Sequence, residues 1–361
     1  MATERLRVKP VRRAMTPDRA THVARLHRDA IIVDAHNDSL RAIEVGDPRY
    51  NPLPDGPPRP RRMWARGESG HWDFVRALEA GQTAQVTNLL VPRPRHGPFA
   101  KTCLKTYERV MVDLEHAPEL ALLATSVADV ERAKREGKTA LILALEGAEA
   151  IEGDLEMLAF YRRLGVRLVG LTWMYRNELG EGNWEDTGAG LTPFGREAIR
   201  AMNALRMAVD VAHATERTFW DTLEVSEATV VCSHGSCRSL VKDFADHAPS
   251  RYLSDEQMRA LAAQGGVLGI FFSANRELAD PNADIGDFAR FFAHAAEVMG
   301  PRHVGLGSDL DGGFPPPGLD DIADLPHLTS ALIDVGFNDE QLLGILGGNW
   351  LRVFGDVWGP A

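Results

Sequence analysis

Five short apolar runs in this chain end on residue types that bind metal ions. They are Ile31–Ala35 before His36, Leu141–Leu145 before Glu146, Ala208–Ala212 before His213, Val230–Ser233 before His234, and His303–Ser308 before Asp309. Runs of this kind, rich in β-branched residues and bounded by Gly, Asp or Asn, are typical of buried parallel strands. Polar residues at the C-terminal ends of such strands occupy the position where a (β/α)8 barrel builds its active site. The pattern therefore predicts a barrel with a metal-dependent hydrolytic site.

Eight expected strands alternate with helical patterns along the chain. The strands are expected at residues 30–36, 83–91, 139–146, 166–173, 207–213, 229–234, 266–272 and 303–309. Helices are expected at residues 17–28, 101–117, 126–136, 154–164, 193–205, 255–264, 285–299 and, in several segments, 326–354, and a further helix is expected to end at Ser226. This alternation favours a closed parallel barrel over an open doubly wound sheet. No GxGxxG or GxxxxGK[ST] sequence opens a helix, which argues against a nucleotide site.

The domain organisation follows from the same pattern. Residues 1–29 form a polar, Arg-rich lead-in that contains one helix, and residues 30–361 form a single α/β domain, a (β/α)8 TIM-type barrel. Residues 46–70 are rich in Pro, Gly and Arg and are expected to form an irregular loop after the first strand. Long loops of this kind inside compact domains are usually functional or disordered.

Composition excludes several classes of partner. A net charge of −11 argues against nucleic acid and anionic membrane surfaces as partners, and 44% hydrophobic residues support a large core. Cys103, Cys232 and Cys237 do not make a disulfide framework and suit a reducing compartment. The N-terminus lacks the apolar stretch of a secretory signal, and the sequence has no transmembrane run. A cytoplasmic location is expected.

The strand-end residues form a plausible binuclear metal site. His36 and Asp38 are two residues apart, so their side chains emerge on the same face of an extended strand. His213 and His234 end strands one βα unit apart and are expected to be neighbours. Glu146, from an intervening position, can bridge two ions with its two oxygens. Mixed imidazole and carboxylate ligands suit Zn²⁺, with Mn²⁺ and Fe²⁺ as alternatives.

The same strand-end residues could instead have only structural roles. A lone histidine at a strand end is more often a hydrogen-bonded structural residue. Five strand ends that converge on ionisable residues are harder to explain in this way, because burying so many charged groups without a metal is costly. Two ions roughly 3.5–4 Å apart can bind and deprotonate a bridging water. Asp309, after the last strand, would then orient that water and shuttle its proton.

With these residues the sequence resembles a known family, the membrane (renal) dipeptidases, which are binuclear zinc peptidases of the amidohydrolase-like superfamily. The resemblance extends from about residue 30 to residue 355. The matching motifs are DAHND (34–38), ALEG (144–147), LT (171–172) with Asn177 after it, VDVAH (209–213), SHGSCR (233–238), the segment 251–256 that begins with Arg251, GSDLDG (307–312) and GGNWLRVF (347–354). Their order and spacing together are specific, whereas none of them alone is.

The resemblance implies a fold, a function and a set of site residues. The implied fold is a (β/α)8 barrel, and the implied reaction is hydrolysis of the amide bond of a small dipeptide through a water bridged between two zinc ions. One zinc would be held by His36, Asp38 and Glu146, and the other by Glu146, His213 and His234. Asp309 would be the acid/base, and Arg251 would pair with the terminal carboxylate of the substrate. The resemblance also favours a homodimer.

One departure from the family pattern concerns the substrate. The resemblance implies a histidine after the fourth-strand LT, as family dipeptidases usually have, which would polarise the scissile carbonyl or the tetrahedral intermediate, but this chain has Trp173 there and Tyr175 two residues later. The Tyr175 hydroxyl could donate to an oxyanion, while Trp173 could simply pack against the site. Two further hypotheses therefore stay open: a binuclear metal amidase or lactonase with a non-standard small substrate, and a catalytically silent relative that binds a small ligand.

Several remaining polar residues are given structural roles. Cys232 and Cys237 are interpreted as buried thiols, and Asp311 as a residue that shapes the turn of DLDGG. Asp34 and Asp210 lie within apolar strands, so they are expected to hydrogen-bond groups that flank the metal ligands.

Overall fold

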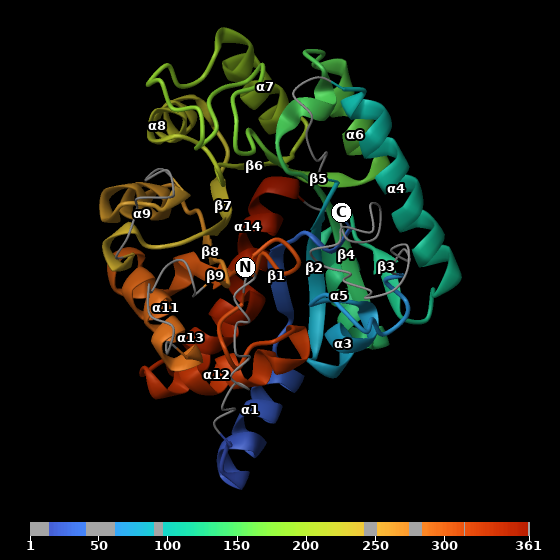
Figure 1. The fold of residues 1–361 in the computed structure, drawn as a ribbon, viewed down its shortest axis with the longest axis vertical. Coiled ribbons are helices and arrows are strands. Elements are labelled where there is room, and N and C mark those ends of the chain that lie inside the picture. The colour runs from blue at the N-terminus through green and yellow to red at the C-terminus, as the bar shows by residue number, and fades with distance from the viewer. Residues whose placement is uncertain are drawn as a thin grey trace, which may run out of the picture.

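The computed structural model describes residues 14–40, 62–89, 97–241, 251–273, 284–313 and 315–359. In these ranges eight parallel strands close into a barrel surrounded by helices (Figure 1). The barrel strands are β1 (Ile32–Asn37), β2 (Gln82–Asn88), β4 (Thr139–Leu145), β5 (Val166–Gly170), β6 (Ala208–Asp210), β7 (Val230–Gly235), β8 (Leu268–Ile270) and β9 (Val304–Leu306). They pair in the order β2-β1-β9-β8-β7-β6-β5-β4, and pairing of β2 with β4 closes the ring. The predicted TIM-type barrel is confirmed.

A ninth strand, β3 (Ala121–Leu123), was not expected from the sequence. It pairs in parallel with Thr139–Leu141, the first half of β4, and β5 pairs with the second half of β4. A run of three residues is too short for periodicity to identify it as a strand. Only the neighbouring strand, which supplies its hydrogen-bond partners, makes it one.

Several barrel strands end earlier than the sequence pattern predicts. The expected strands 166–173, 207–213 and 303–309 end at Gly170, Asp210 and Leu306. The backbone leaves the extended region after these points, and both His213 and Asp309 have a positive φ. The apolar pattern continues into turns that are themselves buried, and hydrophobicity alone does not distinguish these turns from strand.

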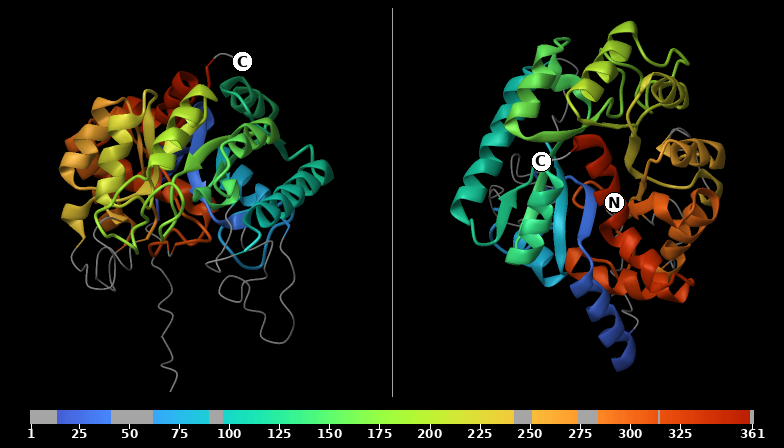
Figure 2. Two further views of the ribbon diagram at one scale, coloured as in Figure 1. Left: turned by 90° about the horizontal axis from the view of Figure 1, so that it is seen from above. Right: turned by 180° about the vertical axis from the view of Figure 1, so that it is seen from behind.

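The expected helices are present in the described ranges, with one addition. They are α1 (Pro17–Asp29), α4 (Phe99–His116), α5 (Val127–Glu136), α6 (Glu156–Leu164), α7 (Pro193–Ala204), α8 (Glu216–Val225), α9 (Asp255–Ala263), α11 (Ile285–Met299), α12 (Leu325–Asp334), α13 (Asp339–Leu343) and α14 (Asn349–Trp358). The additional helix is α3 (Phe74–Glu79), a short helix that Asp73 caps by accepting from the N–H of Arg76. Figure 2 shows the helices arranged around the ring of strands.

Parts of two sequence expectations lie outside the described residues. Of the lead-in, the structure describes α1, which packs on α12: Nη1 of Arg19 donates to the carbonyl of Ser330 at 2.9 Å, and Nε2 of His27 lies 2.8 Å from the hydroxyl of Thr329. Of the irregular loop at 46–70, only residues 62–70 are described, and they form turns and bends. No described helix is long and apolar enough to cross a membrane.

Helix α14 packs against the inner residues of the barrel strands. Its Trp350, Phe354 and Trp358 share one buried apolar cluster with residues of β1, β2, β4 and β7. The indole N–H of Trp350 donates to the carbonyl of Leu306 at 3.0 Å, and a Cβ at Gly305 would overlap that indole. In the left view of Figure 2, α14 lies at the end of the barrel away from the loops that follow the strands. The opposite end of the barrel, where loops follow the C-terminal ends of the strands, is where the predicted site residues lie.

Candidate metal centre

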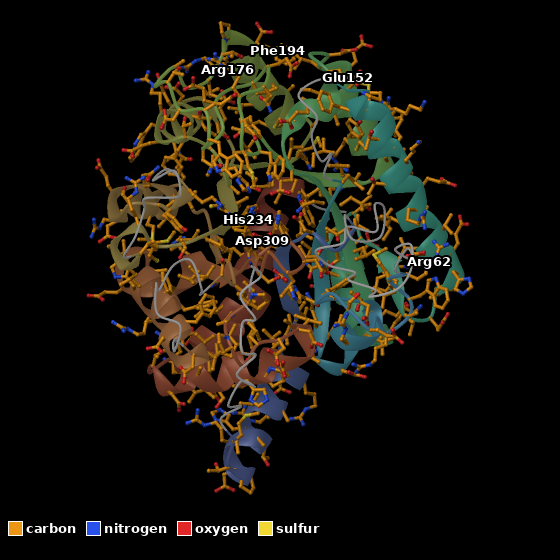
Figure 3. The ribbon with its side chains drawn as sticks, viewed as in Figure 1. Arg62, Glu152, Arg176, Phe194, His234 and Asp309 are labelled. Atoms are coloured by element: carbon orange, nitrogen blue, oxygen red, sulfur yellow. The ribbon has the colours of Figure 1, made fainter. Side chains whose placement is uncertain are left out.

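All six residues predicted as metal ligands or acid/base lie at the C-terminal ends of barrel strands. His36 and His234 are inside β1 and β7, Asp38 and Glu146 directly follow β1 and β4, and His213 and Asp309 lie three residues beyond β6 and β9. Figure 3 labels His234 and Asp309 near the centre of the barrel. Residues separated by more than 270 positions, such as His36 and Asp309, are thus brought together, with His36 Nε2 lying 3.5 Å from Asp309 Oδ1.

The Glu146 carboxylate faces three imidazoles. Its Oε1 lies 3.0 Å from Nε2 of His213, 3.4 Å from Nε2 of His234 and 3.6 Å from Nε2 of His36. The Nε2 atoms of His213 and His234 are 3.0 Å apart. Oε2 of Glu146 is buried and has no hydrogen-bond partner among the described residues. A buried carboxylate oxygen of this kind is costly unless a further group binds it.

The described residues provide two overlapping groups that could hold a metal ion. One consists of His36, Glu146 and His234, and the other of His36, Asp38 and Asp309. His36 Nε2 lies 3.9 Å from Asp38 Oδ1. The structure therefore brings Asp309, which the sequence presented as a proton shuttle, as close to His36 as Glu146 is. Imidazole and carboxylate donors in such groups fit Zn²⁺ or a similar divalent ion.

The electrostatics of the site also fit a cation. Burial lowers the pKa of His36, but the charges of Glu146 and Asp309 outweigh burial and raise it to about 9. Burial raises the pKa of Glu146 to about 7, although the neighbouring His36 opposes this. Burial also raises the pKa of Asp309, but the hydrogen bond and charge of His36 outweigh it and hold that pKa below its ordinary value. The carboxylates thus favour positive charge at the centre of the cluster.

His213 and His234 are held in the form that binds metal. Burial lowers the pKa of both imidazoles well below the ordinary value, which favours the neutral rings. A metal ion binds only the unprotonated nitrogen of histidine, so a neutral ring needs no further proton loss to bind. The ring of His234 also stacks on that of His36, with centroids 3.5 Å apart.

Polar neighbours orient the two neutral rings. Nδ1 of His213 lies 3.1 Å from Oδ1 of Asn183, and Nδ1 of His234 lies 2.9 Å from the hydroxyl of Ser233. Ser233 in turn donates to Asp210 Oδ2 at 2.5 Å. Such partners fix the orientation of a ligating ring and leave Nε2 free for the metal. The expected role of Asp210 is confirmed, whereas sequence reasoning missed Asn183, which lies in a loop 30 residues earlier.

His36 is positioned by a similar set of contacts. Asp34 accepts the backbone N–H of His36 at 3.3 Å and the hydroxyl of Ser308 at 2.5 Å, as expected for a buried aspartate beside a ligand. Nδ2 of Asn88, at the end of β2, lies 2.8 Å from Nδ1 of His36. Asn88 lies inside the strand expected at 83–91, so nothing in the sequence marked it as part of the site, and only the structure shows that β2 ends there.

Two site residues have an unusual backbone. His213 has a φ of 64° and Asp309 a φ of 56°, in the left-handed region that residues other than glycine rarely occupy. Outliers of this kind cluster at functional sites, where the surrounding structure holds them. Gly312 adds a close approach, because a Cβ there would overlap the carboxylates of Asp309 and Asp38. The turn after β9 is thus shaped around these two carboxylates.

The four residues predicted to bind substrate differ in their contacts. Arg251 donates from Nη1 to the carbonyl of His234 at 3.0 Å and lies 4.6 Å above the ring of Phe271, beside the metal centre. Trp173 packs with its ring centroid 6.5 Å from that of His213. The ring of Tyr175 lies 5.5 Å from that of Trp184.

Asn177 has a more structural environment. Its Nδ2 donates to the carbonyl of Leu171 at 2.9 Å, and its Oδ1 accepts from the N–H groups of Leu179 and Gly180. Both ends of the amide are thus engaged with the backbone of the loop after β5. Asn177 therefore organises this loop.

The residues interpreted as structural have structural contacts. Cys232 and Cys237 are buried and form no disulfide. Asp311 accepts the hydroxyl of Ser39 at 2.6 Å and the N–H of His71 at 2.7 Å, which ties the turn after β9 to the segment before α3.

The family follows from comparison with known proteins. Residues 20–358 match the sequence profile of the membrane dipeptidases, peptidase family M19. The chain belongs to this family. It is therefore a hydrolase of a metallopeptidase family of dipeptidases, as the motifs led us to expect.

Individual relatives agree with this assignment. Dipeptidase aclJ of Aspergillus oryzae is 34% identical over 252 residues, which cover 68% of this chain but only 58% of the fungal protein. A metallo peptidase of Rhodobacter sphaeroides, solved with a phosphinate mimic of the dipeptide L-Ala-D-Ala, is 25% identical with a TM-score of 0.79 and covers 91% of this chain and 100% of its own. The probable dipeptidase PvdM of Pseudomonas aeruginosa shares the fold, with a TM-score of 0.82, 20% identity and coverage of 95% and 99%.

Proposed function

We propose that this M19 family member is a binuclear zinc dipeptidase that hydrolyses the amide bond of a small dipeptide. The position of Glu146 carries the proposal. One of its oxygens faces the Nε2 atoms of three histidines, and the other is buried without a hydrogen-bond partner in the described structure. A carboxylate placed in this way suits a ligand shared by two ions.

The proposed ligand sets use residues that already lie together. His36, Asp38 and Glu146 would hold one zinc, and Glu146, His213 and His234 the other. When bound, the two zinc ions supply positive charge that lowers the pKa of a water molecule and polarises the scissile carbonyl. Manganese and iron are the alternative metals for the same donors.

The protein's own residues move the proton and hold the substrate. Asp309, whose pKa lies below its ordinary value, accepts the proton that the attacking water releases and delivers it to the leaving amine nitrogen. The two transfers add one water across the C–N bond. Arg251, whose guanidinium stacks on Phe271 beside His234, pairs with the terminal carboxylate of the dipeptide. The phosphinate dipeptide mimic bound to the Rhodobacter sphaeroides relative supports a dipeptide as substrate.

A second candidate is an amidase or lactonase that acts on a non-standard small substrate. Trp173 favours it, because an apolar ring lies beside His213 where dipeptidases of the family carry a histidine. The Tyr175 hydroxyl is then a candidate donor to an oxyanion from this loop.

Metal analysis and a substrate screen test these proposals. The purified protein is expected to contain about two equivalents of zinc, and chelation is expected to abolish hydrolysis until zinc is restored. Dipeptides with L,L, L,D and glycine-containing sequences should include good substrates. Full metal loading with no dipeptide hydrolysed would favour the second candidate, and well under one equivalent of tightly bound metal would contradict the binuclear proposal.

Two further properties remain proposals. We expect a cytoplasmic enzyme that acts as a homodimer, on the basis of the cysteine content and of the family resemblance. Cell fractionation and light scattering of the purified protein test them independently of the metal.

A further inference from the structure

The loop between β5 and α7 (Figure 1) carries Trp173, Tyr175 and Trp184, of which Trp173 contacts the proposed ligand His213. Trp173 meets His213 edge to face, with ring centroids 6.5 Å apart at 65°. Tyr175 and Trp184 meet in the same way at 5.5 Å and 82°. The N–H of Trp184 donates to the carbonyl of Met174 at 2.6 Å, so the two ends of this segment lie together.

This loop is held in one conformation by buried contacts. Glu181 is fully buried, and its carboxylate accepts the backbone N–H groups of Thr187, Ala189 and Gly190. A Cβ at Gly182 would overlap the carbonyl oxygens of Trp173 and Tyr175, which shows how closely the two segments of the loop pack.

The same loop is tied directly to a proposed metal ligand. Asn183 donates its N–H to the carbonyl of His213 at 2.9 Å and contacts the His213 ring through Oδ1. The backbone that carries the aromatic side chains is therefore held in place relative to His213. A rigid aromatic surface loses little entropy when a ligand covers it.

Part of this surface faces solvent. Trp184 is 54% exposed, and in the part of the chain that the structure describes the only other exposed large hydrophobic residue is Val112, at 43% on α4. An exposed tryptophan on a rigid loop beside a reaction centre is a surface that a ligand can cover with a gain in free energy. Trp173 also replaces the family histidine by a larger and more apolar ring, whose single polar group is the indole N–H.

We propose that Trp173, Tyr175 and Trp184, the aromatic wall, form a specificity subsite that takes an apolar and preferably aromatic side chain of the substrate. The inference rests on the proposed function and names its substrate class. The wall would contact the substrate residue that lies on the His213 side of the scissile bond. Edge-to-face aromatic pairing and removal of apolar surface from water are the physical sources of the preference.

Paired substrates and a matched control variant test the wall. The substrates are phenylalanyl-glycine against alanyl-glycine, and glycyl-phenylalanine against glycyl-alanine, so that each side of the scissile bond is probed. In one of the two pairs the zinc-loaded enzyme is expected to prefer phenylalanine, and Trp184→Ala is expected to lower that preference roughly tenfold, mainly through KM. Trp184→Phe should restore most of it. Val112→Ala, which removes the other exposed hydrophobic side chain, should leave it unchanged.

A binding experiment distinguishes failure of the aromatic wall from failure of the dipeptidase proposal. Calorimetric titration of the same dipeptides into zinc-loaded Asp309→Asn protein, with and without Trp184→Ala, measures the preference without turnover. Failure of hydrolysis with a tryptophan-dependent preference in binding would reject the dipeptidase proposal and keep the wall. Equal preference in wild type and Trp184→Ala, in kinetics and binding alike, would overturn the wall. A dimer that dissociates in Trp184→Ala while the preference is unchanged would also overturn it, since Trp184 would then serve an interface between two copies.

Discussion

Two aspartate–serine pairs hold opposite sides of the candidate metal centre, and they differ in one contact. On the β1/β9 side, Asp34 accepts the N–H of Ser308 at 2.8 Å and its hydroxyl at 2.5 Å. On the β6/β7 side, Asp210 accepts the N–H of Ser233 at 2.8 Å and its hydroxyl at 2.5 Å. The Ser233 hydroxyl also lies 2.9 Å from Nδ1 of His234, whereas the Ser308 hydroxyl oxygen lies 3.2 Å from the backbone carbonyl oxygen of His36 and contacts no imidazole of the described residues.

This difference separates two functions of the residues around a proposed metal ligand, which are to fix its backbone and to fix its side chain. Both pairs join neighbouring strands at the height of the site, so both fix where the backbone of the next residue lies. Only Ser233 touches an imidazole, so only this pair also fixes the orientation and tautomer of a ring. On the other side the residue after Ser308 is Asp309, whose carboxylate has no tautomer to fix. The ring of His36 is contacted by Asn88 and not by a serine.

The largest effect is expected where the two sides meet, at Glu146. Glu146→Gln should lower zinc occupancy on both sides and reduce turnover by about three orders of magnitude, because the shared carboxylate and its charge are lost. His213→Ala should mainly empty the site on the β6/β7 side. Zinc content by mass spectrometry and kcat, with circular dichroism as a control for folding, provide the measurement. Two retained zincs and near-normal turnover in Glu146→Gln would show that Glu146 does not bridge.

The next largest effect distinguishes a proton carrier from a ligand on the β1/β9 side. Asp309→Asn should lower kcat by about 10²–10⁴-fold while both zincs are retained, because an amide cannot accept the proton of the attacking water. Zinc loss in parallel with activity would instead identify Asp309 as a ligand, as its 3.5 Å distance from His36 allows.

The two serines test the comparison itself. Ser233→Ala and Ser308→Ala each remove one hydrogen bond to a buried aspartate and should lower the free energy of unfolding by similar amounts, about 1–3 kcal/mol. Ser233→Ala should in addition weaken zinc affinity by about 10–100-fold, since His234 loses its partner. Denaturant titration and chelator competition measure the two quantities. Equal losses of zinc affinity would mean that both pairs act only through the backbone.

The smallest effect is expected at Asn183. It orients His213 directly, and no aspartate in the described structure holds it as Asp210 holds Ser233. Asn183→Ala should weaken zinc affinity by about tenfold, at the low end for residues that orient a ligating ring. Asn177→Ala is the matched control, because Asn177 binds only backbone of the same loop. That variant should loosen the loop, seen in faster hydrogen exchange, with zinc affinity nearly unchanged. An equal loss of affinity in both variants would assign the effect of Asn183 to the loop conformation.

Much of this centre could be predicted from the sequence because barrel strands are local patterns. A buried parallel strand is a continuous apolar run, so its end is visible in the sequence, and the fold places all such ends on one face. For that reason the sequence predicts that His36, Glu146 and His234 lie at one face of the barrel, and that Asp34 and Asp210 hydrogen-bond groups beside them.

The sequence by itself thus determined the barrel, the family and the residue types at the centre. Tertiary structure decided what local patterns do not encode: the three-residue strand β3, which exists only through its pairing with β4, and the contacts of Asn88 and Asn183 with histidines 52 and 30 residues away. It also decided the left-handed turns that place His213 and Asp309 three residues beyond their strands. The physical reason is that hydrophobic periodicity records which residues are buried, whereas a hydrogen-bond partner is chosen by whichever polar group the closed barrel brings within reach.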